Sequence, residues 1–195
     1  MAFDFDGTLT TTDSFTAFLR WRAGAARYAL GLARLAPAGL RYLIDRDRGR
    51  IKAAATREFL LGLPRDTLEA EARRFADDQA ASLFRPDALA AWRRWRAEGA
   101  RLVIVSASPG VVVGPFAEKL GADRLIATEL AYDSKGCVAG TFATANCRGA
   151  EKIARLKAAF GPDVALKAAY GDTSGDREML EMAEIKGFKV FHARP

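Results

Sequence analysis

The chain has few of the residues on which several kinds of chemistry depend. Its 195 residues include two cysteines, Cys137 and Cys147, and one histidine, His192. Neither cysteine has a neighbouring His or Cys at metal-binding spacing, so we expect two free thiols in a reducing compartment rather than a zinc site or a disulfide. His192 lies in the apolar run FKVFH, where we expect the end of a strand. A Ser-His-Asp mechanism would depend on this single residue and is set aside.

The sequence also lacks a long apolar run. No stretch approaches the ~20 apolar residues that cross a bilayer. The beginning MAFDFDGT is acidic and short, whereas a secretory signal starts basic and continues apolar, so we expect a cytoplasmic protein. Half of the residues are hydrophobic and 28% are charged. This composition and length suit one globular α/β core with a smaller appended domain.

Acidic residues are scarce in one region. Between Ser14 and Gly62 there are ten basic and three acidic residues, a net charge of +7 against −1 for the rest of the chain. Such asymmetry indicates an anionic partner for this region. None of the recognised nucleic-acid-binding modules is present, so we do not expect that partner to be a nucleic acid. A compositional explanation stays open, because Arg outnumbers Lys 22 to 8 in this chain.

Short β-branched or aromatic runs alternate with helix-like segments. We expect strands at AFDF, RLVIVS, RLIAT, LKAAY and FKVFH. Helical patterns such as PDALAAWRRWRAEGA separate the later runs, and this alternation predicts an α/β fold: a Rossmann-like parallel sheet flanked by helices. In TELAYDSKGCVAGTFAT, two alternating apolar runs surround Asp-Ser-Lys-Gly, which predicts a β-hairpin appended to the sheet.

The longest interval between predicted strands indicates a second domain. Roughly ninety residues with helical patterns and no convincing strand precede RLVIVS. A crossover between parallel strands needs only ~10–12 residues. We therefore expect an all-helical cap inserted after the first strand. The predicted division is a core of residues 1–13 and 86–195, with a cap of residues 14–85.

Polar residues follow the ends of several predicted strands and so gather at one edge of the sheet. Ligands of open parallel sheets bind at this edge, beyond the carboxyl ends of the strands. The polar residues are Asp4 and Asp6 after the first strand, Ser106 after RLVIV, Asp172 and Asp176 after LKAAYG, and Lys152 near the start of the preceding helix. The four carboxylates cannot all ionise there without a cation. The four aspartates and Ser106 also have a structural alternative, since aspartates form turns and both Asp and Ser cap helices.

At these positions the sequence resembles the haloacid dehalogenase (HAD) superfamily. DFDGTLT is similar to the first motif of that superfamily, VSAS to the second, Lys152 to the third and GDTSGD to the fourth, in fitting order and spacing over nearly the whole chain. The large helical insert resembles the phosphoserine-phosphatase-like branch, subfamily IB. The run from Cys147 to Lys152, Cys-x-Gly-x-x-Lys, is similar to bacterial phosphatidylglycerophosphatase C-type members.

The resemblance implies a Mg²⁺-dependent phosphomonoester hydrolase. Asp4 would attack phosphorus and form an aspartyl-phosphate. Asp6 would carry the proton for the leaving alcohol and then deprotonate water. Its presence favours hydrolysis of phosphate esters, or mutase chemistry, over dehalogenation or phosphonate cleavage. Mg²⁺ would be held by Asp4, the backbone carbonyl of Asp6 and Asp172.

The remaining motif residues would bind phosphate or support the site. The resemblance implies that the Thr8 backbone, Ser106 and the adjacent Ala107 contact the phosphoryl oxygens. Lys152 would offset charge in the transition state, and Asp176 would orient the metal ligands or Lys152.

Two other cations compete with Lys152 for the third-motif position. Arg148 lies one helical turn earlier, near the place that the lysine occupies in phosphoserine phosphatases, and Lys157 lies further along. We prefer Lys152 because of the Cys-x-Gly-x-x-Lys run.

Two substrate classes stay open. In phosphoserine phosphatases a glutamate nine residues after the nucleophile binds the substrate amine, and a cap arginine binds its carboxylate; Asp13 and Arg57 are the counterparts here. The competing class is a lipid phosphate or another bulky phosphomonoester, which we favour.

The lipid alternative depends on the basic region. LRWRAGAARYALGLARLAPAGLRYLIDRDRGR interleaves Arg with Leu, Tyr and Trp, which suits a cap lying on an anionic membrane surface, such as the inner face of the membrane. An apolar stripe packed inward with Arg outward would have the same pattern. A non-catalytic HAD-fold regulator that senses phosphate or Mg²⁺ is a hypothesis of another class.

Overall fold

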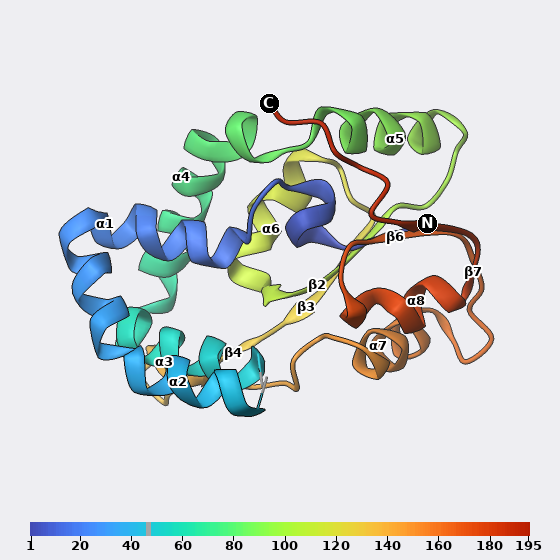
Figure 1. The fold of residues 1–195 in the computed structure, drawn as a ribbon. Coiled ribbons are helices and arrows are strands. Elements are labelled where there is room, and N and C mark those ends of the chain that lie inside the picture. The colour runs from blue at the N-terminus through green and yellow to red at the C-terminus, as the bar shows by residue number, and fades with distance from the viewer. Residues whose placement is uncertain (46–47) are drawn as a thin grey trace.

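A five-stranded parallel sheet forms the centre of the computed structural model, which describes residues 1–45 and 48–195 (Figure 1). The strand order is β3-β2-β1-β6-β7, and every neighbouring pair is parallel. The strands are β1 (Ala2–Phe3), β2 (Val103–Pro109), β3 (Arg124–Thr128), β6 (Leu166–Gly171) and β7 (Ala183–Phe188). The predicted parallel α/β fold is confirmed, and the first strand of the chain lies in the middle of the sheet.

Both faces of the sheet are buried beneath helices. Successive residues of β1 point to opposite sides, so each belongs to a different core. Phe3 packs on Trp92 and Tyr170, with ring centroids 5.0 and 4.5 Å away. Ala2 belongs to the core on the other face with Leu156. The first face is covered by α5 (Pro86–Ala97) and α6 (Gly110–Lys119), and the second by α7 (Ala150–Phe160) and α8 (Arg177–Glu181).

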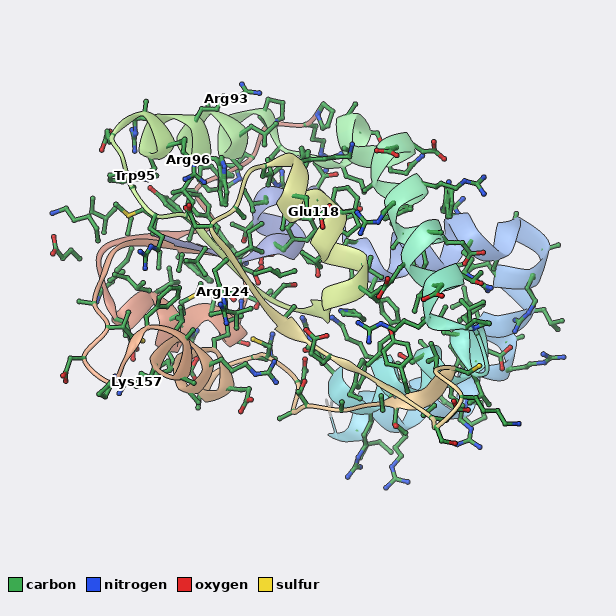
Figure 2. The ribbon with its side chains drawn as sticks, turned by 180° about the vertical axis from the view of Figure 1, so that it is seen from behind. Arg93, Trp95, Arg96, Glu118, Arg124 and Lys157 are labelled. Carbon is green, nitrogen blue, oxygen red and sulfur yellow. The ribbon has the colours of Figure 1, made fainter. Side chains whose placement is uncertain are left out.

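Helix α5 shows how such a covering helix forms. Its apolar residues recur at helical spacing, so one side buries aromatic rings and the other carries arginines. Trp95 faces the sheet and its indole N–H donates to the Tyr170 hydroxyl at 2.8 Å. Figure 2 shows Trp95 on the inner side of the helix and Arg93 on its outer side.

In the described residues, four helices lie between β1 and α5, and we call them the inserted helices. They are α1 (Ser14–Arg34), α2 (Ala36–Asp45), α3 (Arg48–Leu60) and α4 (Arg65–Leu83). Arg46 and Asp47 of the basic region lie outside the described residues. Phe75 of α4 packs on both Phe18 of α1 and Phe116 of α6, with centroids 5.4 and 5.6 Å away, so the inserted helices share the core of the first face.

Two connecting segments join the inserted helices to the sheet and run side by side. The Thr11 N–H donates to the Leu83 carbonyl, and the Arg85 N–H donates to the Leu9 carbonyl, at 2.8 and 2.9 Å. The two connections are therefore held to each other by backbone hydrogen bonds. The division into a core and a cap stays a prediction.

The predicted hairpin forms its own antiparallel sheet of two strands, β4 (Leu130–Tyr132) and β5 (Val138–Phe142), instead of extending the central sheet. The reason lies in the connection between α3 and α4, which pairs with β5. The Gly62 N–H donates to the Val138 carbonyl, and the Val138 N–H donates to the Leu63 carbonyl, both at 2.9 Å. Cys137 of this hairpin and the buried Cys147 are free thiols, as expected.

The expectation for the last strand is wrong. The strand is Ala183–Phe188 rather than FKVFH, because its residues pair with β6 from Leu166 to Gly171. Helix α8 is correspondingly shorter than SGDREMLEMAE suggests. The apolar residues that follow form a tail, in which the His192 N–H donates to Asp87 at 2.6 Å. Among the described helices, none combines the length and apolar character that crossing a membrane requires.

Candidate active site

A tight turn at the carboxyl end of β1 positions the first aspartate. The strand ends at Phe3 and Asp4 follows directly, because the chain enters a single π-helical turn, η1 (Phe5–Leu9). Gly7 in this turn has φ +82°, and a Cβ there would overlap the carboxylate of Asp172. Only glycine allows both the backbone conformation and this close approach. The DFDGT sequence therefore brings Asp4 beside Asp172, 168 positions later in the chain.

Lys152 reaches the site from α7, on the second face of the sheet, and links Asp4 to Asp176. Its ammonium group donates to Asp4 Oδ1 at 2.5 Å, to Asp176 Oδ1 at 2.7 Å and to the Val105 carbonyl at 2.7 Å, and the side chain is 1% exposed. All three of its protons have acceptors. Burial lowers the pKa of Lys152, but the carboxylates of Asp4 and Asp176 outweigh this and raise it. The amine is therefore a fixed positive charge.

The two competing cations have different surroundings from Lys152. Arg148 lines the same pocket, yet it donates to the hydroxyls of Thr173 and Ser174 at 3.2 and 2.7 Å. Lys157 is exposed on the outer side of α7 (Figure 2). The contact with Asp4 thus comes from Lys152, on the first turn of α7.

Asp176 holds the loop that carries Asp172. Its Oδ2 accepts hydrogen bonds from the backbone N–H of Asp172 at 3.2 Å, and from both the N–H and the hydroxyl of Thr173 at 2.9 Å. Burial raises the pKa of Asp176, but Lys152 and these donors outweigh it and lower the pKa. Asp176 is therefore an ionised carboxylate whose two oxygens already accept hydrogen bonds.

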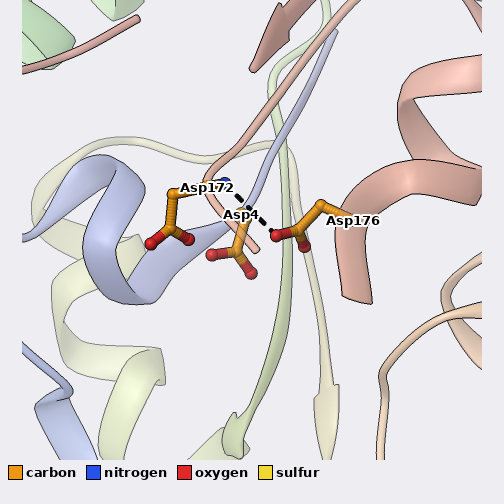
Figure 3. A group of neighbouring side chains, drawn as sticks. All are labelled: Asp4, Asp172 and Asp176. Atoms are coloured by element: carbon orange, nitrogen blue, oxygen red, sulfur yellow. Dashed lines mark hydrogen bonds between the residues drawn. The ribbon is translucent and has the colours of Figure 1, made fainter. Parts of the chain in front are cut away.

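Asp4, Asp172 and Asp176 each offer one carboxylate oxygen to a group in which these three atoms lie within 4.8 Å of one another, and Figure 3 shows the three side chains together. Burial, together with the charges of Asp176 and Asp6, raises the pKa of Asp4 to about 7 despite Lys152. Burial and then Asp176 also raise the pKa of Asp172. Uncompensated negative charge on an all-oxygen donor set fits a hard divalent cation such as Mg²⁺. Because the oxygens of Asp176 are engaged, Asp4 and Asp172 are the side chains left to hold it.

Asp6 lies where the sheet edge meets the inserted helices. Its Oδ1 accepts from the Ser14 N–H of α1 at 2.7 Å, and its Oδ2 from the Ser108 hydroxyl at 2.5 Å. Burial, followed by the charge of Asp13, raises the pKa of Asp6. A carboxyl group that is oriented and has a raised pKa suits proton transfer near neutral pH.

Asp4, Asp6, Lys152 and Asp176 open onto a cavity of about 210 Å³ between the sheet edge and the inserted helices. Lys52 of α3 closes one side, since its ammonium group donates to the Ala107 carbonyl and the Ser108 hydroxyl, both at 3.2 Å. The residues that line the cavity are Asp4, Asp6, Asp13, Arg48, Lys52, Ala107, Asn146, Arg148, Lys152, Thr173 and Asp176.

The predicted phosphate-binding residues lie at the same edge at different depths. Ala107 lines the cavity, while Ser106 is fully buried behind it and its hydroxyl oxygen accepts from the Ser108 N–H at 3.0 Å. The Thr8 hydroxyl lies 3.4 Å from Asp4 Oδ2 and 3.5 Å from Asp172 Oδ1. Thr8 therefore faces both carboxylates that would share a cation.

The two residues expected to recognise phosphoserine are not brought together. Asp13 lines the cavity, but its Oδ1 accepts from the Thr16 N–H at 2.7 Å and caps α1. Arg57 is exposed on α3 beside Gly140 of the hairpin and is not among the residues that line the cavity. The inserted helices contribute Arg48 and Lys52 instead.

Sequence reasoning missed Arg48, Lys52, Ser108, Asn146 and Thr173. Ser108 had a detectable signal, because it lies two residues after Ser106 in a strand. Lys52 had none, since its partners lie 55 and 56 positions away in the chain.

The fold and the site together define a Rossmann-like α/β protein with a carboxylate cluster at the end of the central strand of its sheet. The chain belongs to the family of haloacid dehalogenase-like hydrolases, whose pattern matches residues 1–181. The superfamily resemblance inferred from the four motifs is thereby confirmed.

Individual relatives extend this assignment. The chain is 55% identical to protein CicA of Caulobacter vibrioides (strain NA1000 / CB15N) over 195 residues, which is 100% of this chain and 87% of that protein. A crystal structure of a protein from Bordetella pertussis Tohama I has a TM-score of 0.76 at 25% identity, covering 92% of this chain and 84% of the other.

The fold is also that of phosphoserine phosphatases. A substrate-bound phosphoserine phosphatase has a TM-score of 0.60 at 18% identity, covering 93% of this chain and 81% of that one. At this identity the likeness concerns the fold alone. The family assignment makes the chain a HAD-type hydrolase, and its fold is the one that the sequence predicts.

Proposed function

We propose that this enzyme is a Mg²⁺-dependent phosphomonoester hydrolase with Asp4 as its nucleophile. The observation that carries the proposal is the environment of Asp4. One oxygen of Asp4 is held by Lys152 at 2.5 Å, and the carboxylate lies with Asp172 in a cluster of oxygens within 4.8 Å of one another. Asp4 lines the cavity that a substrate would enter.

The chemistry follows from the placement of Asp4 and Asp6. An Asp4 oxygen attacks phosphorus, the bond to the leaving oxygen breaks, and Asp6 gives its proton to the departing alcohol. The product is an aspartyl-phosphate on Asp4 and an ionised Asp6. Asp6 then takes a proton from water as that water attacks phosphorus, which releases phosphate and restores both carboxyl groups. Ser108 and the Ser14 N–H hold Asp6 for these two proton transfers.

Positive charge at the site offsets the charge of the transferred group. Lys152 supplies a fixed ammonium group, held in place by Asp176 and the Val105 carbonyl. The side chains of Asp4 and Asp172 and the backbone carbonyl of Asp6 would hold Mg²⁺. The bound ion would neutralise Asp4 enough for it to approach an anionic phosphate.

For the substrate we propose a lipid phosphate or another phosphomonoester rather than phosphoserine. Phosphoserine needs one group for its amine and one for its carboxylate. Asp13 instead caps α1, and Arg57 lies outside the residues that line the cavity. The wall of inserted helices presents the cations Arg48 and Lys52, which suit an anionic leaving group.

A chromogenic phosphomonoester with and without Mg²⁺ tests the activity. We expect turnover that EDTA abolishes, that Asp4→Asn abolishes, and that the exposed control Asp163→Asn leaves unchanged. Phosphate and Mg²⁺ binding without turnover would support the non-catalytic regulator, and turnover unaffected by Asp4→Asn would exclude Asp4 as the nucleophile. A panel of phosphoserine, lysophosphatidate and phosphatidylglycerophosphate then tests the substrate class, and equal weak rates on all three would contradict both substrate proposals.

A further inference from the structure

Large aliphatic side chains are exposed at the end of α1 and along α2, which lies on the outer edge of the inserted helices in Figure 1. They are between 49% and 86% exposed, and we call them the apolar patch: Leu30, Leu32, Leu40, Leu43 and Ile44. The three on α2 share one helix face through their i, i+3 and i+4 spacing. Single exposed apolar residues are ordinary, whereas a group of five within fifteen positions indicates an interaction surface.

Basic residues outnumber acidic ones around the apolar patch. From Ser14 to Asp45 the sequence has five arginines and one acidic residue, Asp45, directly after Ile44. Two of these arginines, Arg22 and Arg27, form ion pairs with Glu71 and Glu58 of neighbouring inserted helices. Arg34, between Leu32 and α2, has a side chain that is 57% exposed and lies 3.4 Å from Glu58. The apolar patch is therefore bordered by positive charge.

We propose that the apolar patch docks the protein onto the surface of an anionic lipid membrane. Aliphatic side chains flanked by arginines are the pattern of a helix that lies in the lipid headgroup region, where the apolar side enters the acyl boundary and the cations meet anionic headgroups. A second copy of this chain would bring two positive surfaces together, which opposes association. A nucleic acid would match the charge but would leave the aliphatic side chains in water.

In the sequence the apolar patch lies close to one wall of the catalytic cavity. Ile44 is four positions before Arg48, the first residue of α3, and Arg48 lines the cavity. The apolar patch is thus continuous in the chain with one wall of the cavity. This inference goes beyond the proposed phosphatase activity and does not depend on it, because docking is measured without turnover.

Co-sedimentation with vesicles tests the apolar component. We expect the full chain to sediment with vesicles of equal phosphatidylglycerol and phosphatidylcholine, and much less with phosphatidylcholine alone. The double variant Leu43→Ser/Ile44→Ser should weaken binding by about tenfold or more. The matched control Leu61→Ser/Ile185→Ser changes side chains that are 53% and 45% exposed outside the apolar patch, and it should bind as the unmodified chain does.

Charge reversal tests the electrostatic component on the same vesicles. Arg34→Glu/Arg41→Glu should weaken binding by about tenfold or more, and added salt should weaken binding of the unmodified chain. The control Arg93→Glu/Arg124→Glu changes the same charge on α5 and at the start of β3, far from α2 in Figure 2, and should have little effect. Thermal melts and turnover of a soluble chromogenic phosphomonoester establish that each variant is folded.

Three outcomes would overturn the proposal. Vesicle binding that is absent, or that Leu43→Ser/Ile44→Ser leaves unchanged, would remove the membrane as the occupant. Light scattering that shows a dimer of the unmodified chain and a monomer of this variant would assign the apolar patch to a second copy. Tighter binding to duplex DNA than to vesicles, insensitive to the same variant, would assign the arginines to a nucleic acid.

Discussion

The two walls of the cavity are built differently. On the sheet side, Asp4, Lys152 and Asp176 are buried, and the bonds between them are 2.5 and 2.7 Å long. On the side of the inserted helices, Arg48 is exposed and Lys52 is partly exposed. The polar contacts of Lys52 there are 3.2 to 3.9 Å long.

From this difference we infer that the sheet wall carries out the chemistry and that the wall of inserted helices binds the substrate. A buried ion pair costs desolvation free energy and adds little net stability, so a fully paired cluster beneath a cavity indicates a catalytic requirement. The wall of inserted helices has looser contacts and is joined to the sheet by the paired connection at Thr11 and Arg85. Variants on the sheet wall should therefore lower kcat, whereas variants on the wall of inserted helices should mainly raise KM.

The largest expected effect is on the sheet wall, at the nucleophile. Asp4→Asn keeps the size of the side chain but removes the attacking charge, so we expect kcat to fall by at least about 10³-fold. The measurement is steady-state hydrolysis of a chromogenic phosphomonoester, with Asp163→Asn as the matched control. A fall of less than about tenfold would mean that another group attacks phosphorus.

Lys152→Met should be the most destabilising change at the site. It leaves the buried carboxylates of Asp4 and Asp176 without their cation, which costs about 3–5 kcal/mol of unfolding free energy. Denaturant titration measures this loss. Lys157→Met, an exposed lysine on the same helix, should change stability by less than about 0.5 kcal/mol. Comparable losses for both variants would contradict the central position given to Lys152.

The metal-free protein should lose stability as pH rises. The pKa of Asp4 is about 7 in the folded chain and 3.8 ordinarily, so its contribution is fully present below pH 4 and is lost as pH rises through 7. The loss is up to about 4 kcal/mol. Mg²⁺ favours the ionised carboxylate, so its thermal stabilisation should grow from pH 5 to pH 8. Asp4→Asn should reduce the pH dependence of both the stability and the stabilisation by Mg²⁺. Stabilisation by Mg²⁺ that does not change with pH would mean that the ion binds away from Asp4.

The sequence predicted the sheet wall far better than the wall of inserted helices. Asp4, Asp172 and Lys152 follow strands or begin a helix at one sheet edge, and parallel topology alone brings such positions together. Lys52 lies on a helix whose position over that edge depends on how the inserted helices pack together. The local sequence pattern does not predict this packing. The last strand was misplaced for a similar reason, since pairing with β6 decided its register over the apolar run that follows.

The smallest expected effect distinguishes two cations of α3. Lys52 contacts Ala107 and Ser108 and lies 3.9 Å from Asp13, so Lys52→Ala removes both a positive charge at the cavity and a contact between its walls. We expect kcat/KM to fall by about tenfold, mostly through KM, because this wall binds substrate without taking part in bond breaking. Arg57→Ala changes an exposed cation outside the residues that line the cavity and should stay within about twofold. If Arg57→Ala instead has the larger effect, and only with phosphoserine as substrate, the inserted helices must move enough to bring Arg57 to the cavity. The phosphoserine alternative would then replace the lipid phosphate.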